Sequence, residues 1–266
     1  MLSDPLHPDH WRSRLRPAAP APLCRFDDVT ASTNLNVREM AAAGAPAWSI
    51  SVAEQQTAGR GRLGRSWHSP AGQGLWCSVL LRPQLNAERA PLITFCAALA
   101  MASAVEEACG LRPLIKWPND LVLGGRKICG ILLEVSAGAE GIRHVVVGTG
   151  LNVRRGAYPA ELAHQAASLE DFGQTPRRSD LLVAYHAHLQ DAVARLESEG
   201  FGGIRSDYEA RCCTLGSRVR VTGGAELTGT AEALDDTGAL LVRTDDGTLH
   251  RVLAGDVSVR GVMGYV

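Results

Sequence analysis

The sequence lacks the features that mark a disulfide-bonded, metal-binding or secreted protein. Its seven cysteines are an odd number without C-x-x-C spacing, and the adjacent Cys212 and Cys213 have poor geometry for a mutual bridge. Residues 1–16 contain Pro, Asp and His where a secretory signal would have an apolar core. We therefore expect reduced cysteines, packed as small hydrophobic side chains, in a cytoplasmic protein.

A membrane-spanning run and a global charge bias are absent as well. The longest apolar stretch, residues 92–105, is shorter than the roughly 20 residues that a span needs and is followed by Glu106 and Glu107. It predicts a buried helix. The formal net charge is −1, so any affinity for phosphates must be local. We expect neither a membrane nor a nucleic acid among the partners.

The sequence does contain strand and helix patterns over most of its length. Strand patterns occupy residues 25–29, 48–53, 75–82, 114–118, 120–123, 127–135 and 144–153, and helical patterns occupy 35–43, 90–109, 179–199 and 204–211. From Leu215 onward, short strands alternate with Gly and Asp turn signals, which predicts a small all-β module. The predicted fold class is α+β: a mixed sheet with helices, followed by this module.

Composition divides the chain into three parts. Residues 1–24 are rich in Pro, Arg and His without periodicity and predict a flexible N-terminal tail. A large α+β domain is expected over residues 25–211, and the β module over 212–266.

The most informative stretch is residues 54–67. It contains three arginines among three glycines, with no acidic residue between Gly59 and Trp67. Glycine lets backbone amides approach a ligand closely, and arginine offers forked donors to carboxylate and phosphate oxygens. We interpret this arginine loop, residues 59–67, as a loop that closes over a polyanion. A solvated basic turn without function is the alternative.

The same glycines spell G-x-G-x-x-G, the fingerprint of dinucleotide-binding proteins such as nicotinamide-dependent dehydrogenases. That fingerprint needs a helix that starts within the motif, with the pyrophosphate at its N-terminus. Here residues 66–74 break helices, and residues 75–81 predict a strand. The context therefore argues against a dinucleotide fold.

Three further motifs carry polar groups at strand ends. Lys116-Trp-Pro-Asn-Asp120 sits at a strand junction, although a Pro-defined turn with a cap would look similar. Lys127 follows a Gly-Gly-Arg turn and precedes apolar residues, so it is either a surface lysine or one at a buried edge. Gly148-x-Gly150-x-Asn152 offers bare backbone and one amide, and is a weak signal alone.

Together these motifs resemble, in order, those of the biotin protein ligases, also called biotin–[acetyl-CoA-carboxylase] ligases. The similarity runs from about Phe26 to Asn152, and the β-rich C-terminal part also suits that family. The matching stretches are Ser32-Thr33-Asn34, residues 55–62, residues 116–120, Arg126-Lys127-x-x-Gly130-Ile-Leu-x-Glu134 and Gly148-x-Gly150-x-Asn152. The resemblance implies a class II synthetase-like mixed sheet for the large domain and an SH3-like β-barrel for the C-terminal one.

The resemblance also implies a reaction in two steps. Biotin and ATP would form biotinyl-5′-adenylate and pyrophosphate, with Mg²⁺ present, and a lysine of a biotin carboxyl carrier protein domain would then take the biotin and release AMP. A carboxylate that attacks a triphosphate faces like-charge repulsion, which Arg60, Arg62, Lys127 and the metal ion would neutralise.

Roles transfer by position from the family motifs. The resemblance assigns Lys127, Arg60 and Arg62 to catalysis and to both substrates, with Lys127 bridging the biotin carboxylate and the α-phosphate. The remaining biotin contacts would be Ser32, Thr33, Asn34, Gln56, Gly59, Gly130, Gly148 and Gly150. The remaining ATP or adenylate contacts would be Arg65, Trp67, Lys116, Asn119 and Asn152. Asp120 would be a magnesium contact.

The substrate, a possible DNA-binding function and the oligomeric state stay open at this point. Lipoate–protein ligases share the fold, although the arginine loop favours biotin. Some biotin ligases carry an N-terminal DNA-binding unit and act as repressors, but residues 1–24 are short and broken by prolines, which predicts a monofunctional ligase. A sheet-to-sheet homodimer is one assembly that the resemblance suggests.

Overall fold

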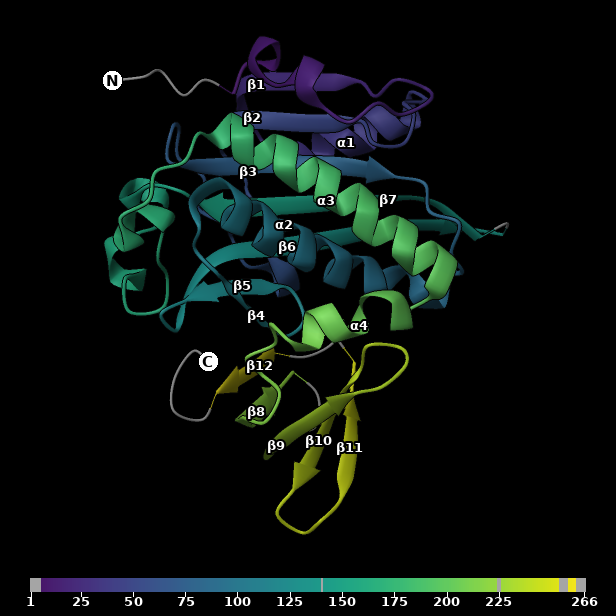
Figure 1. Ribbon diagram of the computed structural model, residues 1–266, viewed down its shortest axis with the longest axis vertical. Helices are drawn as coiled ribbons and strands as arrows, with labels where there is room; N and C mark the ends of the chain where they lie inside the picture. The colour runs from purple at the N-terminus through teal and green to yellow at the C-terminus, as the bar shows by residue number, and fades with distance from the viewer. Residues whose placement is uncertain (1–5, 140, 224–225, 254–257, 262–266) are drawn as a thin grey trace.

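The computed structural model describes residues 6–139, 141–223, 226–253 and 258–261. Its larger part is built on a seven-stranded sheet in the order β1-β2-β3-β7-β6-β5-β4 (Figure 1). Only β1 and β2 are parallel among these neighbours, so the sheet is mixed, as predicted. The strands are β1 (Cys24–Thr30), β2 (Ile50–Gln56), β3 (Gly74–Leu81), β4 (Leu114–Lys116), β5 (Asp120–Leu123), β6 (Arg126–Gly138) and β7 (Gly141–Asn152).

Helices cover the two faces of this sheet unequally. The long helices α2 (Ile93–Cys109) and α3 (Arg178–Glu199) pack on each other and on one face, where Val145 and Val147 of β7 join the main core. The short helix α1 (Thr33–Ala42) packs on the opposite face with Leu80 and Val146, in a separate cluster. Since side chains alternate along a strand, residues 148, 150 and 152 of β7 share the face of α1.

Helix α2 is the buried helix that the sequence predicts. By length and composition alone, Ala87–Cys109 could cross a membrane, but 67% of its apolar window is buried within the protein. The helix ends at Gly110, whose φ of 73° is a left-handed conformation that glycine adopts without strain. A core position between the sheet and α3 accounts for its apolar composition.

The N-terminal region departs from the predicted flexible tail. Residues 1–5 lie outside the described part, but the chain then forms two 3₁₀ turns, Pro8–His10 and Arg12–Arg14. Leu6 and Trp11 are fully buried, and the Trp11 indole donates to the Leu6 carbonyl at 2.8 Å. These turns lie beside β1 at the top of Figure 1. Burial of two large side chains holds the segment in place without any repeating pattern.

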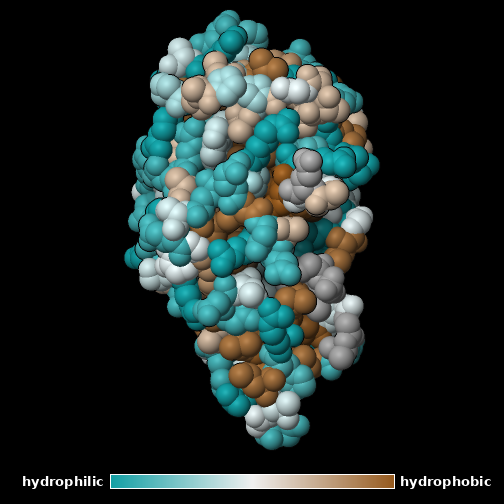
Figure 2. All heavy atoms as spheres, turned by 90° about the vertical axis from the view of Figure 1, so that its right-hand side faces the viewer, coloured by the Kyte–Doolittle hydropathy of each residue, from teal (hydrophilic) through white to brown (hydrophobic). Residues whose placement is uncertain are grey.

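The C-terminal module is a five-stranded antiparallel sheet in the order β11-β10-β9-β8-β12. Its strands are β8 (Arg218–Thr222), β9 (Leu227–Leu234), β10 (Leu240–Thr244), β11 (Leu249–Val252) and β12 (Ser258–Gly261). Within the described residues, β11 and β12 do not pair with each other, so the structure supports the antiparallel sheet and no closed barrel. Viewed from the side, the molecule tapers toward this module (Figure 2).

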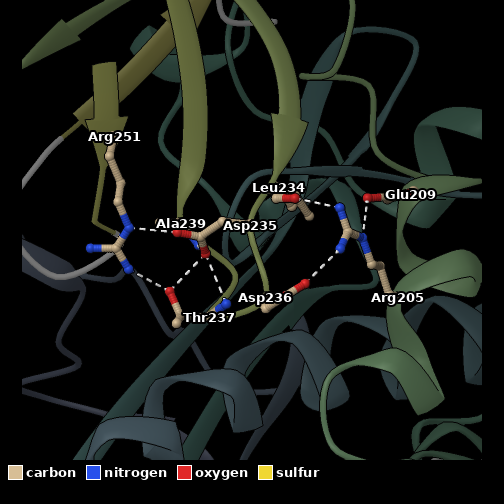
Figure 3. A network of polar contacts seen from close by, with 8 residues as sticks. All are labelled: Arg205, Glu209, Leu234, Asp235, Asp236, Thr237, Ala239 and Arg251. Atoms are coloured by element: carbon tan, nitrogen blue, oxygen red, sulfur yellow. Dashed lines mark hydrogen bonds and ion pairs between the residues drawn. The ribbon is translucent and has the colours of Figure 1, made fainter. Parts of the chain in front are cut away.

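One turn of the module docks on the larger part. Arg205 of α4 (Gly202–Glu209) donates to Asp236 at 3.1 Å and to the carbonyl of Leu234 (Figure 3). Trp117 donates its indole N–H to the Gly238 carbonyl at 3.1 Å, from the junction between β4 and β5. The turn therefore touches the Lys-Trp-Pro-Asn-Asp motif directly.

Candidate active site

A cavity of about 300 Å³ lies on the α1 face of the sheet. Of the predicted site residues, all but Gly59 line it. The structure therefore brings these residues together around one cavity, while their roles stay predictions. What the sequence could not give is how these residues contact one another.

At one end of the cavity, the start of α1 meets the end of β2 and the middle of β3. Thr33 donates its backbone N–H to Gln56 Oε1 at 2.9 Å, and its hydroxyl lies 2.7 Å from Ser78 Oγ. Ser78 in turn donates to Asn34 Oδ1 at 2.6 Å. Ser32 occupies the N-cap position of α1 but makes no side-chain capping bond. The result is a buried wall of hydroxyl and amide groups.

The segment 157–166 contributes to the lining although the sequence did not indicate it, and Ser78 supports the wall through its bonds to Thr33 and Asn34 without being a lining residue. The signal for Ser78 was a lone hydroxyl within the apolar strand 75–81. Tyr158 lines the cavity and donates to Asp171 at 2.6 Å. Burial, together with the Asp171 carboxylate, raises the pKa of Tyr158 to about 12, so it stays a protonated donor. Segment 157–166 carries no motif that would have indicated its position.

Three glycines form the floor of the cavity. Gly130 pairs with Gly150 across β6 and β7, and Gly148 pairs with Ser78 of β3. A Cβ atom on Gly148 would lie 2.1 Å from Asn34 Oδ1, and one on Gly150 would lie 2.3 Å from Trp67 Nε1. Neither position has room for a side chain. The predicted use of bare backbone as a lining surface therefore fits the packing here.

Lys127 and Asp120 form an ion pair inside the cavity. The two atoms Lys127 Nζ and Asp120 Oδ1 are 2.7 Å apart, with side chains 23% and 15% exposed. Lys127 pairs with Val122 and Cys129 with Leu121, so Ile128 is an extra residue in β6, and this bulge re-aims the strand at Lys127. The ammonium also lies 5.1 Å from the centre of the Trp67 ring. Lys127 is thus a partly buried lysine at the cavity edge.

The arginine loop folds over the opening of this cavity. Gly61 and Arg65 are joined by a backbone hydrogen bond of 2.7 Å, and Trp67 donates to the Gly59 carbonyl at 2.9 Å. At the tip, Arg62 Nη1 donates to Asn119 Oδ1 at 2.7 Å. Arg60 and Arg65 are exposed side chains at the rim. The loop is therefore closed onto the Lys-Trp-Pro-Asn-Asp motif.

Gly59 has a different position from the one expected. A Cβ atom there would lie 2.5 Å from the Trp67 carbonyl and 2.9 Å from Ser69 Oγ, outside the cavity lining. Its small size lets the two limbs of the loop approach each other. A contact between Gly59 and a ligand in the cavity is thus not supported by this geometry.

The remaining polar residues lie around Asn119 and Asn152. Asn119 donates to Asp120 Oδ1 at 3.1 Å and to the Ile131 carbonyl at 2.9 Å, and Lys116 beside it is buried. Asn152 donates to the Ala167 carbonyl at 2.9 Å, while its buried Oδ1 has no hydrogen-bond partner among the described residues. Asn152 is a lining residue, and this oxygen has the capacity to accept a hydrogen bond from a ligand that reaches it.

Comparisons with known proteins identify the family to which the chain is similar. A model of the Biotin/lipoate A/B protein ligase family matches residues 26–152, and one of the Biotin protein ligase C terminal domain matches residues 214–260. The biotin–[acetyl-CoA-carboxylase] ligase of Paracoccus denitrificans is 40% identical over 236 residues, which cover 82% of this chain and 93% of that protein. The bifunctional ligase/repressor BirA of Bacillus subtilis is 34% identical over 242 residues, with coverage of 88% and 73%.

The fold is also similar to that of a solved structure. The biotin protein ligase from Aquifex aeolicus in complex with biotin and ATP has a TM-score of 0.78 and 28% sequence identity, over 90% of this chain and 99% of that one. The chain therefore belongs to the biotin/lipoate A/B protein ligase family and, within it, to the biotin protein ligases.

Proposed function

We propose that this protein activates biotin with ATP and transfers it to a lysine of a carrier protein. In the first step, a carboxylate oxygen of biotin bonds to the α-phosphorus of ATP and the bond to the β-phosphate oxygen breaks, which releases pyrophosphate. In the second step, the carrier amine bonds to the acyl carbon of the adenylate, loses a proton, and AMP leaves. No covalent intermediate on the enzyme is needed.

The observation that carries this proposal is the position of Lys127. Its ammonium lies in the cavity between the glycine floor and the closed arginine loop, 2.7 Å from Asp120. A cation there can hold the biotin carboxylate and the α-phosphate together and offset the charge that develops between them. Arg60 and Arg62 would add positive charge from the loop side.

Polar groups at the two ends of the cavity support the assignment of the substrates. The hydroxyl and amide wall of Ser32, Thr33, Asn34 and Gln56 suits a ureido ring, which has two N–H donors and one acceptor. The end near Asn152, Lys116 and Asn119 would hold the adenylate, with Arg65 at the rim and Trp67 as a stacking surface. Gly130, Gly148 and Gly150 would line the biotin chain.

Asp120 could contribute one carboxylate ligand to a magnesium ion. It is the single carboxylate among the described residues that line the cavity, and it is paired with Lys127. Mg²⁺ at such sites is held by one or two carboxylates and substrate phosphates. We therefore propose that the triphosphate would supply most of the ligands, with Asp120 as the protein contribution. The ion would supply charge neutralisation on the phosphates.

Several broader assignments extend this proposal. Residues 25–211 would form the catalytic domain with a class II synthetase-like sheet, and residues 212–266 would form an SH3-like barrel, of which 224–225, 254–257 and 262–266 lie outside the described part. The substrate partner would be a biotin carboxyl carrier protein domain. The proposal also includes a cytoplasmic location and a homodimer. Light scattering would distinguish a monomer of 28.3 kDa from a dimer of twice that mass. A reducing compartment suits the seven free cysteines.

Pyrophosphate exchange tests the proposed activity. The purified chain with biotin, ATP and Mg²⁺ should incorporate labelled pyrophosphate into ATP, and mass spectrometry should detect biotinyl-5′-adenylate. Exchange with lipoate but not with biotin would instead identify a lipoate ligase. A gel-shift experiment with operator DNA would reveal a repressor function, for which the described residues offer no separate DNA-binding unit.

A further inference from the structure

A buried ion pair lies next to the arginine loop but outside the cavity. Arg178, at the start of α3, is 4% exposed in its side chain, and Glu54, near the end of β2, is 19% exposed. The two bond through both guanidinium nitrogens: Arg178 Nη1 donates to Glu54 Oε2 at 2.7 Å, and Nη2 donates to Oε1 at 3.0 Å. Glu54 and Arg178 are not among the described residues that line the cavity.

This pair connects the outgoing and returning limbs of the segment that contains the arginine loop. Glu54 precedes Gln56, where β2 ends and residues 57–73 begin. The returning limb is bonded to both partners: Gly72 donates its N–H to Glu54 Oε2 at 3.2 Å, and Arg178 Nη1 donates to the Gly74 carbonyl at 3.3 Å. Helix α3 thereby fixes both limbs at their base.

The N-terminal segment covers the pair on another side. Leu6, which is fully buried, donates its backbone N–H to Glu54 Oε1 at 3.4 Å. Burial of this kind makes an ion pair an unfavourable way to gain stability, because the desolvation cost offsets much of the attraction. What a bidentate pair offers over an apolar contact is a fixed direction and distance. The chemistry therefore suits a positioning role.

We propose that the Glu54–Arg178 pair is a clamp that holds the arginine loop closed over the cavity and so retains the adenylate. The clamp sets the separation of the two limbs, and that separation places Trp67 over Gly150 and Arg62 against Asn119. Retention matters because a mixed anhydride of this kind reacts with any lysine or water that it meets. The part that concerns the adenylate rests on the proposed function; the part that concerns the loop does not.

Tryptic cleavage within the loop tests the clamp in the ligand-free protein. Trypsin cuts after arginine, and opening of the loop exposes the bonds after Arg60, Arg62 and Arg65. We expect Glu54→Gln to raise the initial rate of cleavage at these bonds about tenfold, measured by mass spectrometry of the fragments. Arg178→Lys keeps the charge but not the fork, and we expect a rise of a few-fold.

Leu196→Ala is the matched control for general destabilisation. Leu196 is fully buried on the same helix, eighteen residues or about 27 Å beyond Arg178. Its truncation should lower the melting temperature at least as much as Glu54→Gln does, while loop cleavage stays at the wild-type rate. Equal cleavage in Glu54→Gln and Leu196→Ala would overturn the clamp. Should Glu54→Gln not fold, Glu54→Met with Arg178→Leu replaces the pair by apolar packing and should show the same increase.

The activity readout is biotin on unrelated lysines. With biotin, ATP and serum albumin as a non-carrier acceptor, Glu54→Gln should label albumin about tenfold faster than wild type, and the KM for biotin should stay within twofold. A merely structural pair would lower all rates together and leave albumin labelling no faster. Absence of exchange in the wild type would refute the proposed function, while the cleavage experiment would still decide whether the loop is clamped.

Discussion

At the scale of single residues, the proposed function depends most on Lys127. Lys127→Ala removes the cation that lies 2.7 Å from Asp120 and leaves the hydroxyl and amide wall around Thr33 and Asn34 intact. We expect adenylate formation to fall by roughly 100-fold or more, in line with the loss of one transition-state donor. Biotin binding should change little. Pyrophosphate exchange and calorimetric titration of biotin measure the two effects separately.

The control for this variant is Arg143→Ala, which removes an exposed cation of β7 that is not among the residues lining the cavity. It should exchange pyrophosphate at the wild-type rate. An exchange rate in Lys127→Ala close to that of Arg143→Ala would remove Lys127 from the mechanism.

Gly150 offers a steric test of the cavity floor. In Gly150→Ala, the new methyl group would meet Trp67 Nε1 at 2.3 Å, so either the indole or the strand must move. Overpacking of this kind costs about 1–3 kcal/mol, which corresponds to a fall of roughly 5- to 150-fold in kcat/KM if the strain falls on the site. Gly202→Ala, where no atom lies within 4 Å, is the control and should match wild type. Steady-state kinetics compares them.

Residue types and spacing predicted which side chains gather at the site, but not how they pair. Lys127 and Asp120 are seven positions apart, and their contact depends on a bulge at Ile128 that no sequence pattern announces. Gly59 looked like a ligand contact because it belongs to the arginine loop, yet it packs between the limbs. Short sequence motifs therefore predict which chemical groups are present, whereas the contacts between these groups depend on the register of the strands.

At the scale of elements, the arginine loop is the part expected to move. Arg62→Gly removes the 2.7 Å bond to Asn119 and adds backbone freedom at the tip. We expect the adenylate to escape, so that biotin appears on unrelated lysines about tenfold faster, because a closed loop excludes bulk nucleophiles. Labelling of serum albumin followed by mass spectrometry measures this.

Arg62→Lys is the companion variant, since it retains the charge without the planar fork. It should fall between wild type and Arg62→Gly. If Arg62→Gly retains its adenylate as tightly as wild type, the loop does not act as a lid.

Most helices and strands of the larger part could be predicted from the sequence, because the spacing of apolar residues within each element is a local feature. The helix predicted at 179–199 is observed as Arg178–Glu199, and the strand predicted at 75–82 as Gly74–Leu81. The N-terminal turns were missed because Leu6 and Trp11 are buried by contacts that are distant in sequence. Such contacts leave no period of 2 or 3.6 to detect.

At the scale of the whole molecule, one turn joins the C-terminal module to the site. Trp117 lies within the Lys-Trp-Pro-Asn-Asp motif and donates to Gly238, so the module helps to position the residues on either side of Trp117. Asp235 shapes that turn: its Oδ1 accepts from the Thr237 N–H at 2.8 Å and from the Ala239 N–H at 3.0 Å (Figure 3). Arg251 donates to its other oxygen.

The charge on Asp235 predicts how acid affects this docking. Burial opposes its ionisation, but the bonds from Arg251, Thr237 and Ala239 outweigh burial and lower the pKa of Asp235 to about 2. The unfolded chain has the ordinary value of about 3.9. The stabilisation is therefore complete above about pH 4 and is lost as pH falls from about 4 to 2.

Asp235→Asn should remove that share of the acid dependence and lower the stability at pH 7 by roughly 1–2 kcal/mol, since hydrogen bonds to a charged acceptor are replaced by weaker ones. Urea unfolding at pH 7, 4 and 2.5 measures the free energy in both proteins. Thr237→Val keeps the carboxylate but removes one donor at 2.7 Å, and should reduce the pH dependence of stability only in part.

Because the turn contacts Trp117, we also expect kcat/KM to fall in Asp235→Asn. Parallel pH profiles in wild type and Asp235→Asn would show instead that the turn is held by packing, for example of Phe95 and Leu92 near Gly238.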